Sequence, residues 1–296
     1  MNRKNPPQPP SSGGTGGFGG DDALAWLAGR RPAIVPAFSA APAPFNAGPV
    51  RERVRYAVLD LLRSTRSAER IAAAAAEMGA TADQAWSDER PAVEARKQPG
   101  FACAAGCAWC CYQQVAVAPA EAIAIAKYVA ATFSAAALAL LKTRLAALDS
   151  GAHGLGPRGR ARLKSPCAFL VDNACSIYPV RPLRCRGVYS RNAAHCRWAM
   201  ETPDAVFDDR ARHGKAGPYP VEPAAIADAA LTGLAQAFEQ AGLCWEALEL
   251  TAALRVALDT PDLAERYAAG EAVFAGCELP PRGDDSAGLA KPPDSA

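Results

Sequence analysis

The sequence has no long hydrophobic run, no excess of charge and very little histidine. Its longest apolar stretch, Tyr128–Leu141, contains Thr132 and Ser134 and is only fourteen residues long, whereas a membrane-spanning helix needs about 20 residues. The formal net charge is +2, and binding to nucleic acid or to a membrane surface requires clustered basicity. We therefore expect neither a membrane nor a nucleic acid as a partner.

The N-terminal segment also lacks the apolar core of a secretory signal and a twin arginine. This predicts a cytoplasmic protein, in which thiols stay reduced and dense cysteines indicate metal rather than disulfides. The only histidines are His153, His195 and His213. His195 adjoins Cys196, but adjacent residues rarely face each other as nucleophile and base. We expect His195 to be a surface residue or a spare metal ligand.

Cysteine is the residue type that the sequence concentrates. Eight of its ten cysteines fall in two groups. The first group occupies nine residues and comprises Cys103, Cys107, Cys110 and Cys111; the second has intervals of 8, 10 and 11 residues and comprises Cys167, Cys175, Cys185 and Cys196. Thiolates bind soft and borderline metals strongly, and short spacings let one loop present several sulfurs to one centre. The eight residues are therefore predicted to be metal ligands.

The residues around the cysteines refine this prediction. Gly106 suits a loop that needs unusual backbone angles around a metal. Cys244 and Cys277 stand alone in helical or tail context, and we expect them to be small hydrophobic residues. Five arginines lie in the second group and could offset the negative charge of a four-thiolate site: Arg181, Arg184, Arg186, Arg191 and Arg197.

The type and number of centres stay open at this point. Four thiolates suit one zinc ion or one [4Fe–4S] cluster, so eight permit one centre with spare cysteines or two centres. Cys110 and Cys111 are neighbours whose side chains diverge in a helix or a strand, so they are not expected to serve one metal in the same way. The irregular spacing differs from paired Cys-x2-Cys zinc knuckles and favours an iron–sulfur cluster, most simply [4Fe–4S], over zinc.

The segment from about residue 100 to residue 198, a third of the chain, resembles the YkgJ-type cysteine-cluster family, the CxxCxxCC zinc- or iron-chelating domain. The resemblance is carried by Cys-x3-Cys-x2-Cys-Cys at 103–111 and by the block Cys-Ser-Ile-Tyr-Pro-Val-Arg-Pro-Leu-Arg-Cys-Arg at 175–186. The first gap is three residues where the family usually has two. The resemblance implies a bound metal ion or iron–sulfur centre with a redox, structural or metal-handling role.

Two enzymatic functions are the alternatives. Some relatives of this family are flagellin lysine N-methylases, which makes a protein-modifying methylase the alternative function, although no glycine-rich S-adenosylmethionine loop follows a strand. The spacing of Cys103, Cys107 and Cys110 also matches that of radical S-adenosylmethionine enzymes. Those enzymes build a β/α barrel, and this sequence shows no pattern of strands alternating with helices. Whether the protein is an enzyme, and which protein it contacts, stay open.

The hydrophobic periodicity predicts a mainly α fold, a helical domain with an irregular cysteine-rich metal-binding insert. Helices are expected from about Val50 to a break at Gly79, after Pro119, after Ser134 as N-cap, and in two stretches beyond residue 220. Residues 151–159 and 166–198 are expected to be irregular. The expected organisation is a disordered arm over 1–48, one domain over 49–278 with the cysteine segment at 100–198, and a disordered tail over 279–296.

Overall fold

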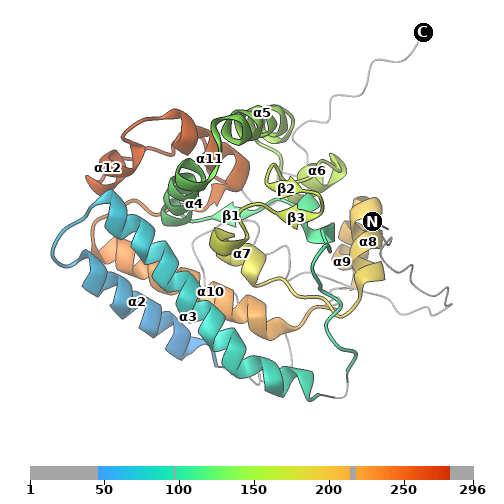
Figure 1. The fold of residues 1–296 in the computed structure, drawn as a ribbon. Helices are drawn as coiled ribbons and strands as arrows, with labels where there is room; N and C mark the ends of the chain where they lie inside the picture. The colour runs from blue at the N-terminus through green and yellow to red at the C-terminus, as the bar shows by residue number, and fades with distance from the viewer. Residues whose placement is uncertain (1–45, 97, 214–217, 281–296) are drawn as a thin grey trace, which may run out of the picture.

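The computed structural model describes residues 46–96, 98–213 and 218–280, and most of these residues lie in helices (Figure 1). The expected mainly α-helical fold is confirmed. The longer helices are α2 (Gly48–Leu62), α3 (Ala68–Glu94), α4 (Pro119–Thr132), α5 (Ala135–Ala152), α8 (Ala193–Glu201), α9 (Pro203–His213), α10 (Val221–Gln240) and α11 (Leu250–Asp259). The shorter ones are α6 (Pro157–Arg162), α7 (Leu183–Arg186), α12 (Leu263–Ala268), and the 3-10 helices η2 (Trp109–Tyr112) and η3 (Tyr178–Val180).

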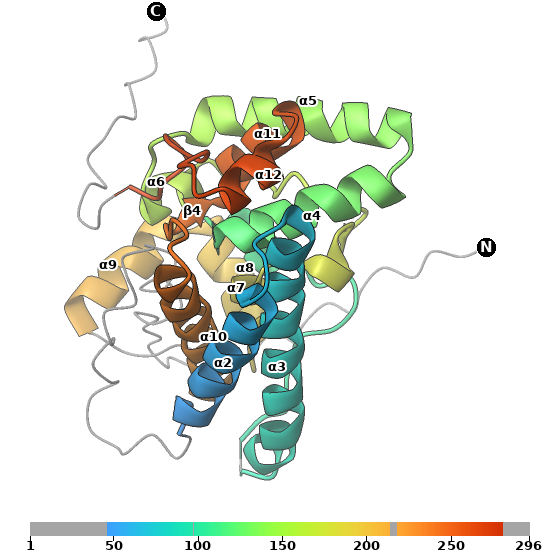
Figure 2. The same cartoon turned by 90° about the vertical axis from the view of Figure 1, so that its left-hand side faces the viewer.

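Helices α2, α3 and α10 pack along one another and form one part of the core (Figures 1 and 2). Val54 and Val58 of α2 are fully buried, one helical turn apart. The helices α2 and α10 approach each other closely at Gly233, where a Cβ atom would lie 2.3 Å from the carbonyl oxygen of Arg51. A glycine is needed there because no side chain fits between the two backbones.

The helix α3 is longer than predicted. Its N-cap is Ser67, whose side chain accepts a hydrogen bond from the N–H of Arg70. The expected break at Gly79 is wrong, because Ala82 and Trp86 continue the buried face beyond it. A glycine inside a helix costs only about 1 kcal/mol relative to alanine, which burial of these later side chains exceeds.

A second group of helices, α4, α5 and α11, packs across one end of the first (Figure 2). The prediction of Ser134 as an N-cap is confirmed, since its hydroxyl accepts from the N–H of Ala137 at 3.2 Å. The strand β1 (Ala116–Val117) pairs in antiparallel fashion with β4 (Leu248–Glu249). This pairing joins the chain just after the first cysteine group to the start of α11.

The cysteine segment is more regular than predicted. Residues 166–198 contain α7, most of α8 and a hairpin of β2 (Leu170–Val171) and β3 (Ala174–Cys175). Residues 151–159 are likewise not a continuous loop, because α5 ends at Ala152 and α6 begins at Pro157. Short local elements therefore hold the second cysteine group in place.

Most of the predicted arm and tail, residues 1–45 and 281–296, lies outside the described residues. Within the described part, α2 begins at Gly48, and the N–H of Leu279 donates to the carbonyl of Ala247 at 3.1 Å. The division into an arm, a domain and a tail stays a prediction. Over the same described residues, none of the helices has the length and apolar character that crossing a membrane requires.

Candidate metal centre

The first cysteine group lies on a tight loop that runs into η2. Gly106 has a φ of 85°, which residues with a side chain rarely adopt, and the N–H of Cys107 closes a turn on the carbonyl of Ala104 at 3.0 Å. The unusual backbone expected at Gly106 is confirmed. Cys103 and Cys110 are exposed and the other two thiols of the group are half-buried, so the loop offers its sulfurs near the surface.

Two cysteines of the second group are brought together by the hairpin. Asp172 and Asn173 form its turn with φ values of 49° and 61°, the two successive left-handed residues of a type I′ turn. The turn pairs Cys175 with Leu170, and the N–H of Leu170 donates to the carbonyl of Cys167 at 2.9 Å. The seven residues between Cys167 and Cys175 are thereby folded back on themselves.

Backbone amides of the same hairpin stabilise charge on its sulfurs. The N–H of Phe169 donates to the sulfur of Cys167, and the N–H of Ile177 donates to that of Cys175. Each bond lowers the pKa of the thiol that receives it and opposes the effect of burial. Hydrogen bonds of this kind to metal-bound sulfurs tune iron–sulfur centres.

Cys185 lies on α7, whose first turn is held by a buried carboxylate. Glu121 accepts from the N–H of Leu183 at 2.6 Å and from the N–H of Ala118 at 2.9 Å. One side chain thus satisfies unpaired amides at the start of both α4 and α7. Burial raises the pKa of Glu121, although both of these bonds favour its charged form.

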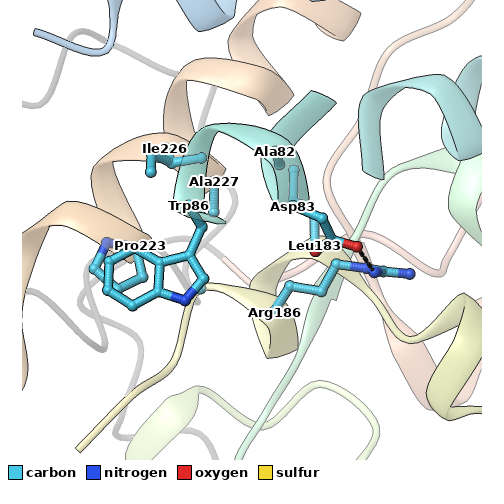
Figure 3. Close-up of a pocket in the computed structure, with 9 residues that line it drawn as sticks. Ala82, Asp83, Trp86, Leu183, Arg186, Pro223, Ile226 and Ala227 are labelled. Carbon is cyan, nitrogen blue, oxygen red and sulfur yellow. Dashed lines mark hydrogen bonds and ion pairs between the residues drawn. The ribbon is translucent and has the colours of Figure 1, made fainter. Parts of the chain in front are cut away.

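The opposite side of α7 lines a small cleft against α3 and α10 (Figure 3). The cleft has a volume of about 10 Å³, which is room for one water molecule. Arg186 crosses it to form an ion pair with Asp83, and Trp86 forms its wall. Contacts on both sides therefore fix the position of Cys185.

Cys196 lies in α8, which packs on η2. The side chain of Asn192 caps α8, and the Tyr219 hydroxyl lies 3.9 Å from the sulfur of Cys196. Two residues before the cap, the N–H of Ser190 donates to the sulfur of Cys103 at 3.2 Å. The start of α8 therefore lies against the first cysteine loop.

The expectation of His195 as a surface residue is wrong. It is 6% exposed, and its ring packs against Trp198 and Tyr219 with centroid separations of 5.5 and 5.8 Å. Two aromatic neighbours give the imidazole an apolar environment, which accounts for its burial beside Cys196.

The two cysteine groups meet at Cys111 and Cys167. The N–H of Cys167 donates to the carbonyl of Cys111 at 2.7 Å. The thiols also affect one another's pKa. The pKa of Cys103 is raised in part by Cys107, Cys110 and Cys196. That of Cys111 is raised in part by Cys110, Cys167 and Cys185. The structure thus brings all eight predicted ligands into one region of mutual electrostatic influence.

The thiols differ widely in acidity. Burial raises the pKa of Cys103 and of Cys167 to about 11, and raises that of Cys185 well above the ordinary range. Cys110 differs, because the hydrogen bond from Cys111 lowers its pKa to about 7 and raises that of Cys111. Most of the set is therefore protonated at neutral pH, so a metal that binds there must displace protons.

Only part of the expected arginine set faces the sulfurs. Arg181, which stacks on Tyr178, favours the thiolate of Cys110 and opposes the rise that burial causes in the pKa of Cys175. Sequence reasoning missed Arg160, which is 2% exposed and opposes the rise that burial causes in the pKa of Cys167. The other four arginines make ion pairs or bond to backbone carbonyls elsewhere: Arg184 to Asp228, Arg186 to Asp83, Arg191 to Pro99 and Val93, and Arg197 to Glu201.

The chemistry of the donor set fits a thiophilic metal, although the side chains are not arranged around a common metal position. Among the described residues, no group of three or more Cys, His, Asp or Glu side chains is arranged to hold a metal ion. The donors are nevertheless all sulfur, and three of the eight receive backbone N–H bonds. This chemistry suits zinc or an iron–sulfur cluster and disfavours oxygen-preferring cations.

Cys244 and Cys277 lie apart from this set. Cys277 is 3% exposed within the hydrophobic core, and the thiol of Cys244 donates to the carbonyl of Gly270 at 3.7 Å. Tyr219 approaches the set from outside the cysteine segment. Nothing in the sequence around Tyr219 indicates this contact, because it depends on how α10 follows α8 in space.

Comparison with known proteins gives one match. Residues 102–202 match the family model described as "CxxCxxCC: Putative zinc- or iron-chelating domain". This confirms the resemblance seen in the cysteine motifs. No curated protein and no solved structure matches the chain.

Proposed function

We propose that the CxxCxxCC segment holds an iron–sulfur centre on its cysteine thiolates and serves in redox chemistry or metal handling. The observation that carries the proposal is the all-sulfur donor set, in which backbone N–H groups already point at Cys103, Cys167 and Cys175. Such bonds stabilise thiolates before any metal arrives. When bound, an iron–sulfur centre supplies one-electron transfer.

The position of the first cysteine loop supports a redox or transfer role over a purely structural one. Cys103 and Cys110 are exposed residues, whereas burial raises the pKa of the Cys167 and Cys185 thiols. A structural zinc is usually enclosed by its four ligands, whereas a centre near the surface can exchange electrons or metal with a partner. Because the role requires reduced thiols, a cytoplasmic location belongs to the same proposal.

Zinc is the second candidate, because the loops that carry Cys167 and Cys175 suit it as well. The amide bonds to Cys167 and Cys175 come from residues two positions further along the chain, so each cysteine sits on a short loop that presents one sulfur. Such loops serve tetrahedral zinc as well as iron. A radical S-adenosylmethionine enzyme is disfavoured, since the mainly helical fold differs from the β/α barrel of those enzymes.

Anaerobic purification followed by analysis of iron, zinc and acid-labile sulfide tests the proposal. We expect a brown protein with broad visible absorption that contains iron and sulfide. The matched control is Cys244→Ser, which changes a cysteine outside the cluster and should leave the metal content unchanged. A colourless protein with stoichiometric zinc would replace iron–sulfur by zinc, and a protein with neither metal would overturn the proposal.

A further inference from the structure

One arginine of the cysteine region is buried without an ion-pair partner. Arg160 is 2% exposed and is the largest of the side chains that are almost completely buried. Its neighbours on α6, Arg158 and Arg162, both form ion pairs with Asp204. Arg160 forms none with the residues that the structure describes, and its Nε atom is buried among them without a hydrogen-bond partner. Because arginine stays protonated in proteins, the fold encloses a cation at a considerable cost in free energy.

The guanidinium of Arg160 joins the end of the first cysteine group to the start of the second. Its Nη1 atom donates to the carbonyl of Tyr112 at 3.2 Å and to that of Ser165 at 3.0 Å. Tyr112 directly follows Cys111, and Ser165 stands two residues before Cys167. The main-chain bond from Cys167 to Cys111 connects the same two stretches. The buried cation therefore lies where the two cysteine groups meet.

The helix that carries Arg160 is itself fixed beside the first cysteine group. Gln114, which is 1% exposed, donates through its side-chain nitrogen to the carbonyl of Leu155 at 2.8 Å, shortly before α6 begins. The same helix packs on α9, with ion pairs from Arg158 and Arg162 across the contact. The position of Arg160 is thus determined by contacts that do not involve its own charge.

The described part of the chain offers little to neutralise this charge. Glu249 and Cys167 are the two groups whose negative charge would raise the pKa of Arg160 and so oppose the effect of burial. The carboxylate of Glu249 already accepts the N–H groups of Thr251 and Ala252 at 2.7 and 3.0 Å, and these described residues include no ion pair between Glu249 and Arg160. A cysteine thiol is uncharged, whereas a metal-bound cysteine is a thiolate. Cys167 therefore becomes a full counterion only when it binds metal.

We infer that Arg160 is a positioning residue for the metal centre, a buried cation that holds the two cysteine groups together and balances the charge of their thiolates. The inference rests on the proposed function, because it assigns a residue outside the cysteine set to the same centre. A site of four thiolates is negatively charged with either zinc or a [4Fe–4S] core, and a fixed cation nearby favours its formation. Without the centre, the hydrogen-bond partners of Arg160 among the described residues are two neutral carbonyl groups.

Two substitutions separate the charge of Arg160 from its hydrogen bonds. Arg160→Lys keeps the positive charge, whereas Arg160→Gln keeps N–H donors and loses the charge. Arg160→Met is a further uncharged variant in case Arg160→Gln does not fold. The matched control is Arg162→Gln, which removes from the same helix a guanidinium that pairs with Asp204. Circular dichroism establishes the folding of each variant.

Each protein is purified anaerobically and freed of metal, and its zinc affinity is measured by competition with a chromophoric chelator. The reduction potential is measured after reconstitution with ferrous iron and sulfide. We expect Arg160→Gln to bind zinc about 10- to 100-fold more weakly than the wild type, as is typical when a group behind the ligands is lost. Its reduction potential should be lower, because loss of a cation disfavours the added electron. Arg160→Lys and Arg162→Gln should stay close to the wild type.

The comparison of the lysine and glutamine variants decides the inference. A loss confined to the uncharged variant supports it. Equal affinities and equal potentials in folded Arg160→Lys and Arg160→Gln would show that the charge plays no part and would overturn it, with the proposed function intact. If the wild type itself binds neither zinc nor iron, the proposed function fails and the inference fails with it.

Discussion

The backbone N–H of Cys167 donates to the carbonyl oxygen of Cys111 at 2.7 Å. This bond joins the end of the first cysteine loop to the start of the hairpin that presents the second group. Because it involves only main-chain atoms, substitution of either side chain leaves the bond possible. The sulfurs can thus be removed one at a time without dismantling the scaffold that positions the others.

The hairpin turn is predicted to control metal binding through backbone conformation. Asn173→Val places a β-branched residue at a φ of 61°, and such left-handed residues cost about 1–2 kcal/mol. The turn should open and move Cys175 away from Cys167. We expect reduced metal content together with a lower free energy of unfolding in urea. Asn173→Gly is the control and should retain its metal; equal loss in both variants would contradict the account.

Glu121 is predicted to be needed as a carboxylate rather than for its shape. Both of its oxygens accept backbone N–H groups, from Ala118 and Leu183. In Glu121→Gln the amide NH₂ must face one of these donors, so one buried N–H loses its partner at a cost of about 1–3 kcal/mol. Urea unfolding should show this loss, and metal retention should fall because α7 carries Cys185. Wild-type stability and metal content in the variant would refute the role.

Gly233 is predicted to set the spacing of α2 and α10. In Gly233→Ala the new methyl group would lie 2.3 Å from the carbonyl oxygen of Arg51, and overpacking of this kind costs about 1–3 kcal/mol. Gly151→Ala is the matched control, since nothing lies within 4 Å of a Cβ there and alanine favours a helix by up to about 1 kcal/mol. Thermal unfolding should shift in opposite directions for the two variants, and a shift in the same direction would count against the packing.

The contact between α6 and α9 is predicted to depend on pH. Arg162 and Arg158 lower the pKa of Asp204 below its ordinary value of 3.8. Because the folded-state pKa is depressed, the stabilisation is present above pH 3.8 and is lost as the pH falls through the folded-state value. For these exposed ion pairs it amounts to less than about 1 kcal/mol.

Asp204→Asn should therefore be slightly less stable than the wild type at pH 7, and the difference should shrink toward pH 2–3 as the carboxylate is protonated. Urea unfolding at several pH values measures it, and added salt should reduce it at pH 7. A difference that stays constant over the whole range would show that the charge of Asp204 does not stabilise this contact.

The local features of the fold could be predicted from the sequence, and those that depend on distant contacts could not. Ser134 was identifiable as a cap because capping acts within one turn. The expected end of α3 at Gly79 is wrong because the packing that continues the helix comes from distant parts of the chain: α10 and α7 pack on α3, and Trp86 lies against Phe101 and Tyr189. The hairpin carried a readable signal in Asp172–Asn173, two residue types that tolerate left-handed conformations, but the surrounding prolines obscured it.

In the candidate site, too, local features could be predicted from the sequence and features that depend on distant contacts could not. Cysteine density alone predicts the eight candidate donors. Their proximity depends on the meeting of η2, α8, the hairpin and α7, which no spacing encodes. The burial of His195 likewise depends on Tyr219, which reaches it from beyond the cysteine segment. Sequence patterns therefore predict the candidate ligands, and the contacts around them depend on tertiary structure.

X-ray absorption at the iron edge of the anaerobically purified protein tests the central claim most directly, because it reports the atoms bound to the metal. The account predicts iron with a first shell of sulfur alone and a short iron–iron separation, as in an iron–sulfur cluster. A first shell of oxygen or nitrogen, or the absence of iron from the protein, would contradict it.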